Sequence, residues 1–255
     1  MTLLFAIVGD PVAQVRSPEV FNRLFDERGV DAVMVPLLVR PSGFAATLSG
    51  LRKVENLAGL IVTVPHKASA AQLLNKASAR VKIANASNVL RPCLDGWEGD
   101  LFDGEGFARG MEAEGHVLQG AHCALVGCGG AGAAIALALL ERDVASLSIW
   151  DIDQARAADL AQRLRAVTSV EISVTPPDAQ SDVAINATPL GMDENDPVPF
   201  FLERLRNGAL VADAIMKPPR TKLLREAERR GHPIQEGRHM LDNQVKGIWS
   251  FFGLP

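Results

Sequence analysis

The stretch from Gly127 to Gly132 carries glycines at the spacing G-x-G-x-x-G, which binds phosphate groups in many nucleotide-dependent proteins. An apolar run before it, Cys123–Val126, predicts a buried strand, and an Ala- and Leu-rich run after it, Ala131–Arg142, predicts a helix. The first glycine permits the tight turn, the second lets the backbone approach a pyrophosphate, and the third lets helix and strand pack closely. We therefore expect a dinucleotide to contact Gly127, Gly129, Gly130, Ala131 and Gly132.

A carboxylate follows the next predicted strand, Leu147–Trp150, where such sites bind the ribose. Asp151 lies 24 residues beyond the first glycine, and an acid there accepts hydrogen bonds from the ribose hydroxyls. Its charge would repel a 2′-phosphate, so the sequence favours NAD over NADP. Arg156 is the one nearby cation that could bind this phosphate instead. Asp151 is also a candidate N-cap of a helix over Gln154–Arg165, a role for which Asp153 competes.

Two further segments place polar groups directly after predicted strands, where ligands bind in α/β proteins. They are Thr63–Lys67 and Asp100–Gly104. Both have ordinary alternatives, because a lysine after a strand is usually a solvated surface residue and Asp-Gly is usually a turn. His66 stands beside Lys67, and its place in a Pro-His-Lys turn favours a role in placing the backbone over a role in catalysis.

The composition limits the classes of function. The chain has 255 residues, 47% of them hydrophobic, and a net charge of −4, which argues against nucleic acid and anionic membranes as partners. No apolar run reaches the ~20 residues of a membrane span, and the N-terminal run Leu3–Val8 is too short for a signal-peptide core. Three cysteines without a C-x-x-C pair indicate neither a disulfide framework nor a metal site. We expect a cytoplasmic protein.

Strands alternate with helices along both halves of the chain, which predicts α/β domains with largely parallel sheets. The expected strands of the first half are Leu3–Val8, Ala32–Leu38 and Gly59–Val64, and its helices are Pro18–Arg28, Gly43–Lys53 and Ala68–Leu74. The second half begins near Gly104 and adds strands at Glu171–Val174, Val183–Asn186 and Leu210–Asp213, a loop at Thr188–Pro199, and helices at Lys222–Arg230 and Met240–Phe252. Right-handed crossovers would stack these later strands into a dinucleotide-binding sheet.

Seven short motifs follow one another along the chain in a fixed order. They are Gly9–Ala13 with Ser17-Pro18, Val62–Lys67, Ala86–Asn88, Gly99-Asp100 with Asp103-Gly104, the glycine loop, Ile185–Met192, and Thr221 with Leu223-Leu224, Gly237, Met240-Leu241 and Gln244. In these motifs the chain resembles the shikimate dehydrogenase family from end to end. The resemblance implies an α/β substrate domain at 1–104, completed by a C-terminal helix at 238–255, and a Rossmann-type dinucleotide-binding domain at 105–237.

The family passes a hydride between a nicotinamide and a ring carbon bearing a hydroxyl of a cyclohexene or cyclohexane carboxylate. The resemblance therefore implies a small hydroxy acid as substrate. We expect a monomer or a homodimer. The resemblance also implies that Lys67 is catalytic and paired with Asp103; the amine can take the hydroxyl proton as hydride leaves, and return it in reverse. The remaining implied residues bind substrate, at Ser17, Thr63, Asn88 and Gln244, or cofactor, at Thr188 and Gly237. An aspartate at Asp151 matches the NAD-preferring members.

The chain departs from the family pattern where the substrate carboxylate is expected. Val15 replaces a serine and Met216 a tyrosine, and Ile61 and Phe102 are apolar where the family has polar residues. Arg16 is an alternative ligand for the carboxylate. Three interpretations stay open: a shikimate or quinate dehydrogenase, an enzyme of the same chemistry with a less polar substrate, and a non-enzymatic NAD-binding protein. Retention of the lysine–aspartate pair argues against the last.

Overall fold

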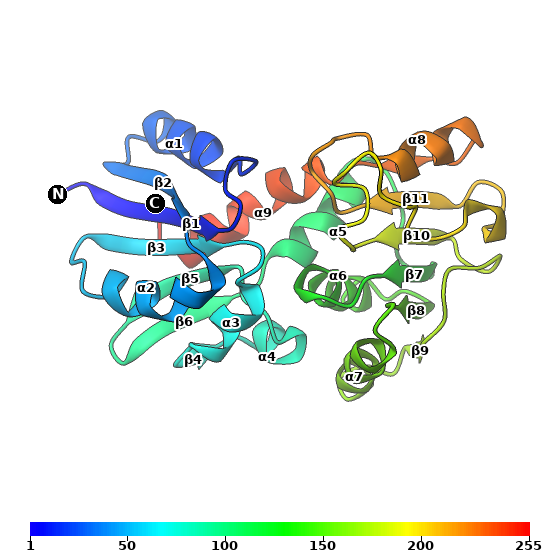
Figure 1. Cartoon of the computed structure of the whole chain (residues 1–255), viewed down its shortest axis with the longest axis horizontal. Helices are drawn as coiled ribbons and strands as arrows, with labels where there is room; N and C mark the ends of the chain where they lie inside the picture. The colour runs from blue at the N-terminus through cyan, green and yellow to red at the C-terminus, as the bar shows by residue number, and fades with distance from the viewer. The chain divides into compact units, whose positions relative to one another are not determined.

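The computed structural model describes residues 1–255 and divides into two compact units. The first unit comprises Met1–Phe102 together with Lys246–Pro255, and the second comprises Asp103–Val245. Each unit is built on one six-stranded sheet with helices between its strands (Figure 1). The predicted α/β class is therefore confirmed for both.

The sheet of the first unit is mixed, with the strand order β2-β1-β3-β5-β6-β4. Strand β1 pairs in parallel with β2 and β3, whereas β5 is antiparallel to both β3 and β6. The strands are β1 (Leu3–Gly9), β2 (Ala32–Leu38), β3 (Leu57–Val62), β4 (Lys76–Ala77), β5 (Val89–Cys93) and β6 (Gly96–Asp100). The helices are α1 (Ser17–Glu27), α2 (Phe44–Leu51), α3 (Lys67–Gln72) and α4 (Ala79–Ala84), with a 3₁₀ turn at Pro41–Gly43.

The prediction of a largely parallel sheet is wrong for one side of this unit. The sequence pattern does not predict the hairpin of β5 and β6, because Pro92, Gly96 and Gly99 make both segments poor strand formers by themselves. The two strands form through pairing, with Cys93 opposite Gly96 and Val89 opposite Asp100. Since β5 runs against β3, its first residue, Val89, pairs with Ile61 near the end of β3, which brings Asn88 beside Val62.

The sheet of the second unit is parallel throughout, in the order β12-β11-β10-β7-β8-β9. Its strands are β7 (His122–Val126), β8 (Ser146–Trp150), β9 (Glu171–Ser173), β10 (Val183–Asn186), β11 (Leu210–Asp213) and β12 (Ile234–Gln235). Its helices are α5 (Asp103–Ala113), α6 (Gly130–Leu140), α7 (Gln154–Arg165) and α8 (Lys222–Arg229), with a 3₁₀ turn at Leu202–Arg204. Helix α9 (Arg238–Phe251) continues from this unit into the first. The predicted dinucleotide-binding sheet is confirmed.

The end of the chain completes the core of the first unit. Trp249 is 5% exposed, and its ring lies 5.6 Å from that of Phe25 on α1. The Arg28 guanidinium stacks over the Trp249 ring, with its Cζ 4.6 Å from the ring centroid. Phe252 lies 4.9 Å from Phe5 of β1, ring centre to ring centre. The predicted return of the C-terminal helix to the N-terminal unit is thus confirmed, and it rests on aromatic packing.

We expect Trp249→Ala to destabilise the first unit by about 3–5 kcal/mol, because it removes a buried indole and leaves a cavity that the sheet cannot close. The measurement is urea unfolding, followed by hydrogen exchange of the amides of β1. Phe201→Ala is the control, since that ring is 61% exposed. Equal loss of stability in both variants would show that α9 contributes nothing specific to this core.

Candidate active site

The glycine loop turns sharply from β7 into α6. Gly127 has φ +103°, a conformation that side chains rarely adopt, and a Cβ there would lie 2.7 Å from the carbonyl carbon of Ala187. A Cβ on Gly132 would overlap the carbonyl oxygen of Gly127, so only glycine lets the helix start this close to the strand. A Cβ on Gly129 would meet nothing within 4 Å. Gly127 and Gly132 therefore pack tightly against the protein, whereas the space beside Gly129 is open.

The start of α6 fits an anion. Its N-cap is Gly129, and no side chain caps the helix, so its first N–H groups are left for water or a ligand. The positive end of the helix dipole adds to their attraction for negative charge. Space at Gly129 together with a bare helix start fits the diphosphate of a dinucleotide. Burial, and secondly the charge of Asp151, raise the pKa of the Cys128 thiol to about 12, so this cysteine stays protonated in the loop.

Asp151 follows β8 and binds the glycine loop directly. Its Oδ2 accepts a hydrogen bond of 2.8 Å from the Cys128 amide, and its Oδ1 accepts one of 2.9 Å from the Asp153 amide. The residue is 7% exposed. Each carboxylate oxygen keeps a further lone pair, which suits the two ribose hydroxyls. The N-cap of α7 is Asp153, whose side chain accepts from the Arg156 amide, so the alternative role proposed for Asp151 falls to Asp153.

Arg156 lies between these two carboxylates. Its guanidinium is 3.8 Å from Asp151 Oδ2 and 3.5 Å from Asp153 Oδ2, and its side chain is 53% exposed. A 2′-phosphate would meet one cation and two anions here.

The rim beyond β10 and β11 is a single hydrogen-bonded network. Asn186 Oδ1 accepts from both the amide and the hydroxyl of Thr188, at 2.9 and 2.7 Å. The Thr188 hydroxyl also accepts from the Leu190 amide at 3.1 Å, so this oxygen is already used within its loop. The network brings Thr188 beside Gly127, whose missing Cβ would lie 2.8 Å from the Thr188 amide nitrogen. Thr188 thus lies next to the glycine loop and constrains its shape through a backbone contact.

Gly237 lies at the far side of the same rim. A Cβ on it would lie 2.5 Å from the carbonyl oxygen of Ile215 and 2.7 Å from the carbonyl carbon of Ala214. The chain after β12 therefore packs backbone to backbone on the chain after β11. Met216, at the position expected for a tyrosine, follows this contact and is half-buried.

In the first unit, Thr63 and Asn88 come together where β3 ends and β5 begins. The Val62 amide donates to the Asn88 carbonyl at 2.7 Å, and Asn88 Oδ1 accepts from the Phe102 amide at 2.9 Å. The Thr63 methyl group packs against Gly9 at the end of β1. Lys67 begins α3 and is half-buried, and its carbonyl accepts from the Ser87 amide at 2.9 Å. Thr63, Lys67 and Asn88 therefore share one edge of the sheet.

Two other residues of this unit have clear roles in its packing. His66 is 1% exposed, its Nε2 lies 2.6 Å from the Val39 carbonyl oxygen, and its ring stacks on Phe44 at 4.3 Å. These contacts make it a structural residue, as its turn position indicates. The Phe102 ring packs on α9, where a Cβ at Gly247 would lie 2.7 Å from it, so its apolar character serves the helix contact. Ser17 is 4% exposed at the first position of α1.

Asp103 and Gln244 belong to the second unit. Asp103 begins α5, and Gln244 lies on α9, whose backbone packs on α5 at Gly106; a Cβ there would overlap the Met240 carbonyl oxygen and lie 2.8 Å from Gln244 Cβ. Both side chains are nearly buried, at 3% and 6% exposure. Their roles, and the pairing of Asp103 with Lys67 of the first unit, stay predictions.

Sequence reasoning missed Asp213, although it ends a strand that was expected. Its Oδ1 accepts from Asn186 Nδ2 at 3.1 Å and from the Ile215 amide at 2.9 Å, and its Oδ2 accepts from the Thr221 hydroxyl at 2.8 Å. Asp213 is fully buried and no cation contacts it; burial raises its pKa to about 6, against the effect of the three hydrogen bonds. It joins the loops after β10 and β11 to the start of α8.

No three metal-ligating side chains are gathered in one place, and none of the helices has the length and apolar character that a membrane crossing requires.

Asp213→Asn tests this buried charge. The folded protein keeps a proton on Asp213 up to pH about 6, whereas the unfolded chain releases it near 3.8, so stability falls as the pH rises through this window. The neutral variant lacks this loss. We expect its unfolding free energy, relative to the unaltered protein, to gain up to about 3 kcal/mol between pH 4 and 7 in urea titrations. The control is Asp159→Asn, which removes an exposed carboxylate on α7 and should show no such trend. If the difference in unfolding free energy between Asp213→Asn and the unaltered protein did not change with pH, the raised pKa of Asp213 would be contradicted.

Comparison with known proteins agrees with this geometry. The model of the shikimate dehydrogenase substrate-binding domain matches residues 7–90. The shikimate dehydrogenase (NADP(+)) of Rubrobacter xylanophilus is 35% identical over 247 residues, which cover 94% of this chain and 87% of that protein.

Two solved structures match over almost the whole chain. The ligand-free 5-ketofructose reductase of a Gluconobacter species has a TM-score of 0.86 at 26% identity, covering 99% of this chain and 94% of that one. The quinate dehydrogenase of Corynebacterium glutamicum, in complex with NAD, has a TM-score of 0.83 at 27% identity, with coverage of 99% and 94%. The chain belongs to the shikimate dehydrogenase family.

Proposed function

We propose that this protein is an NAD-dependent dehydrogenase that oxidises a ring hydroxyl of a hydroxy acid such as shikimate or quinate, and reduces the corresponding ketone in reverse. The observation that carries the proposal is the Asp151 carboxylate bound to the amide of a glycine loop whose centre is open. That pair of features suits a nicotinamide dinucleotide. Family membership supports the reaction class.

Each site residue then has a separate role. Lys67 takes the proton of the reacting hydroxyl in oxidation and returns it in reduction, and Asp103 fixes the position of the amine. Thr63, Asn88 and Gln244 bind the other hydroxyls of the ring, and Ser17 contacts the carboxylate. A bound nicotinamide supplies the hydride acceptor.

NAD is the proposed cofactor, although the curated relative is named for NADP(+). Support comes from charge, because the carboxylates of Asp151 and Asp153 both lie close to the Arg156 guanidinium. Bringing a 2′-phosphate here would place it against two carboxylates, and like charges at close range are costly. The quinate dehydrogenase neighbour was solved with NAD.

A second candidate is a reductase of an uncharged polyhydroxy ketone. Val15 and Met216 lack the hydroxyls that the family uses for the substrate carboxylate, and a neighbour at 26% identity is named 5-ketofructose reductase. An enzyme that lost these partners would forfeit about 1–3 kcal/mol for each carboxylate hydrogen bond left unmade, and would bind a neutral substrate without that loss.

A substrate panel separates the candidates. The unaltered protein is assayed for NADH formation with shikimate and quinate, and for NADH consumption with 5-ketofructose. We expect turnover of a ring acid, and Lys67→Ala to lower kcat by about 10²–10⁴, because a positioned acid–base group is lost. NAD affinity, from fluorescence titration, should change less than about twofold.

Lys82→Ala is the matched control, since Lys82 is exposed on α4 of the same unit. Near-normal kcat in Lys67→Ala would remove this lysine from the reaction. Turnover of 5-ketofructose alone would favour the second candidate, and no turnover with any substrate would leave an NAD-binding protein.

Cofactor choice is tested at Asp151. The unaltered protein should prefer NAD over NADP in kcat/KM by at least about tenfold, and Asp151→Asn should narrow this ratio, since it removes the charge and keeps an acceptor for the Cys128 amide. Asp159→Asn on α7 should leave the ratio unchanged. A preference of the unaltered protein for NADP would assign Arg156 to the phosphate instead.

A further inference from the structure

Helix α5 begins at Asp103 and has little helix stability of its own. Three of its eleven residues are glycines, Gly104, Gly106 and Gly110, which lose more backbone freedom on folding than other residues. Asp103 is nevertheless almost fully buried. The place of this carboxylate therefore depends on what holds α5.

The glycines bring α5 against the backbones of its neighbours. A Cβ on Gly104 would overlap the Ala134 carbonyl oxygen of α6, and a Cβ on Gly110 would lie 2.8 Å from His239 Cβ on α9. Such contacts allow a close approach. They do not interlock side chains, which is what normally fixes the rotation and the axial position of one packed helix on another.

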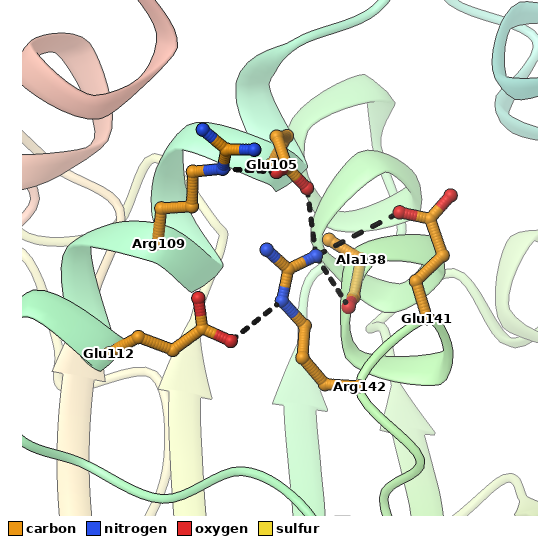
Figure 2. A network of polar contacts seen from close by, with 6 residues as sticks. All are labelled: Glu105, Arg109, Glu112, Ala138, Glu141 and Arg142. Atoms are coloured by element: carbon orange, nitrogen blue, oxygen red, sulfur yellow. Dashed lines mark hydrogen bonds and ion pairs between the residues drawn. The ribbon is translucent and has the colours of Figure 1, made fainter.

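Arg142, just beyond the end of α6, adds a directional side-chain contact to the packing of Phe107 and Met111, which α5 buries (Figure 2). Its Nη1 lies 2.8 Å from Glu105 Oε2, and its Nε lies 3.1 Å from Glu112 Oε1. The same guanidinium is tied to its own helix end, with Nη1 at 3.4 Å from the Ala138 carbonyl oxygen and 3.8 Å from Glu141. Figure 2 shows Arg142 between the two glutamates of α5, with Arg109 also bound to Glu105.

The geometry of this cluster constrains α5 in two directions. Glu105 and Glu112 lie seven residues apart, on the same face of α5 and two turns from each other. One planar guanidinium that binds both therefore fixes the rotation and the axial position of the helix. The side chains of Arg142 and Glu105 are 14% and 17% exposed, so water screens this contact less than it screens a surface ion pair, whereas Glu112 is 43% exposed. Burial opposes ionisation of Glu105, but Arg142 and Arg109 outweigh it and lower its pKa.

We propose that Arg142 is a positioning residue for Asp103. It holds α5 in one register on α6, whose first turn is the glycine loop, so Asp103 keeps a fixed place relative to the cofactor site. Gly104 beside Ala134 and Glu112 beside Arg142 show that the two helices run in the same direction, with Asp103 at the glycine-loop end. The inference rests on the proposed function, because it takes Asp103 to act in the reaction.

A double-mutant cycle tests it on the full-length protein. We expect Arg142→Met to lower kcat for the ring acid about tenfold, with NAD affinity nearly unchanged. In the Asp103→Asn background the same substitution should lower kcat no further, because the residue through which it acts is gone. Arg142→Lys, which keeps the charge, should restore part of the activity. Multiplicative losses in the cycle would overturn the proposal and leave Arg142 a general stabiliser.

Hydrogen exchange gives a readout that needs no activity. Arg142→Met should speed exchange of the α5 amides at least about tenfold, without changing β7 or β10. Arg163→Met, which removes an arginine paired with Asp159 on α7, should leave both kcat and α5 unchanged. If the unaltered protein turns over no substrate, the proposed function fails. Unchanged exchange of the α5 amides in Arg142→Met would overturn the positioning of α5 by Arg142. If Arg142→Met does not fold, Glu112→Gln replaces it in the double-mutant cycle, because this substitution weakens only the contact between Arg142 and Glu112.

Discussion

Close approach of one backbone to another, which only glycine permits, is the constraint on which the second unit depends. At Gly132 the carbonyl of Gly127 leaves no room for a side chain, and this sets α6 directly on the end of β7. The same device joins Gly237 to Ala214 and Ile215 across the rim. The shape of the glycine loop is therefore fixed by main-chain contacts, and it does not depend on which rotamers the surrounding side chains adopt.

Hydrogen-bond donors of the loops also stabilise two buried carboxylates. Asp151 and Asp213 are both buried, and a buried charge is costly unless polar groups replace the water it loses. Asp151 accepts hydrogen bonds from backbone amides of the glycine loop and of its own turn. Asp213 accepts them from the Ile215 amide, the Asn186 side-chain amide and the Thr221 hydroxyl. Each loop thus presents donors to a carboxylate, and each carboxylate holds its loop in place. Along the carboxyl edge of this sheet, the shape of each loop and the charge of the carboxylate that it binds therefore depend on each other.

Sequence periodicity predicts most of this fold, and the failures have physical causes. Helix α7 and strand β10 have the bounds that their patterns indicate, because one face of α7 is apolar and β10 is a continuous buried run. The hairpin of β5 and β6 and the glycine-rich α5 escape prediction, since both depend on tertiary contacts that override poor local propensity. Thr63, Lys67, Asp103 and Asp151 could be placed after strands from sequence, whereas Ser17, Asn88 and Gln244 rest on the family resemblance. The network around Asp213 could not be predicted, because hydrogen-bond partners far apart in the chain leave no local pattern.

Helix α9 has a consequence for the order of events during synthesis. The segment Lys246–Pro255 belongs to the first unit but leaves the ribosome after the whole of the second. The aromatic side chains of α1 and β1 have no Trp249 or Phe252 to bury them until then. The second unit, continuous from Asp103 to Val245, reaches completion first, so the unit that begins the chain is the last to close its core.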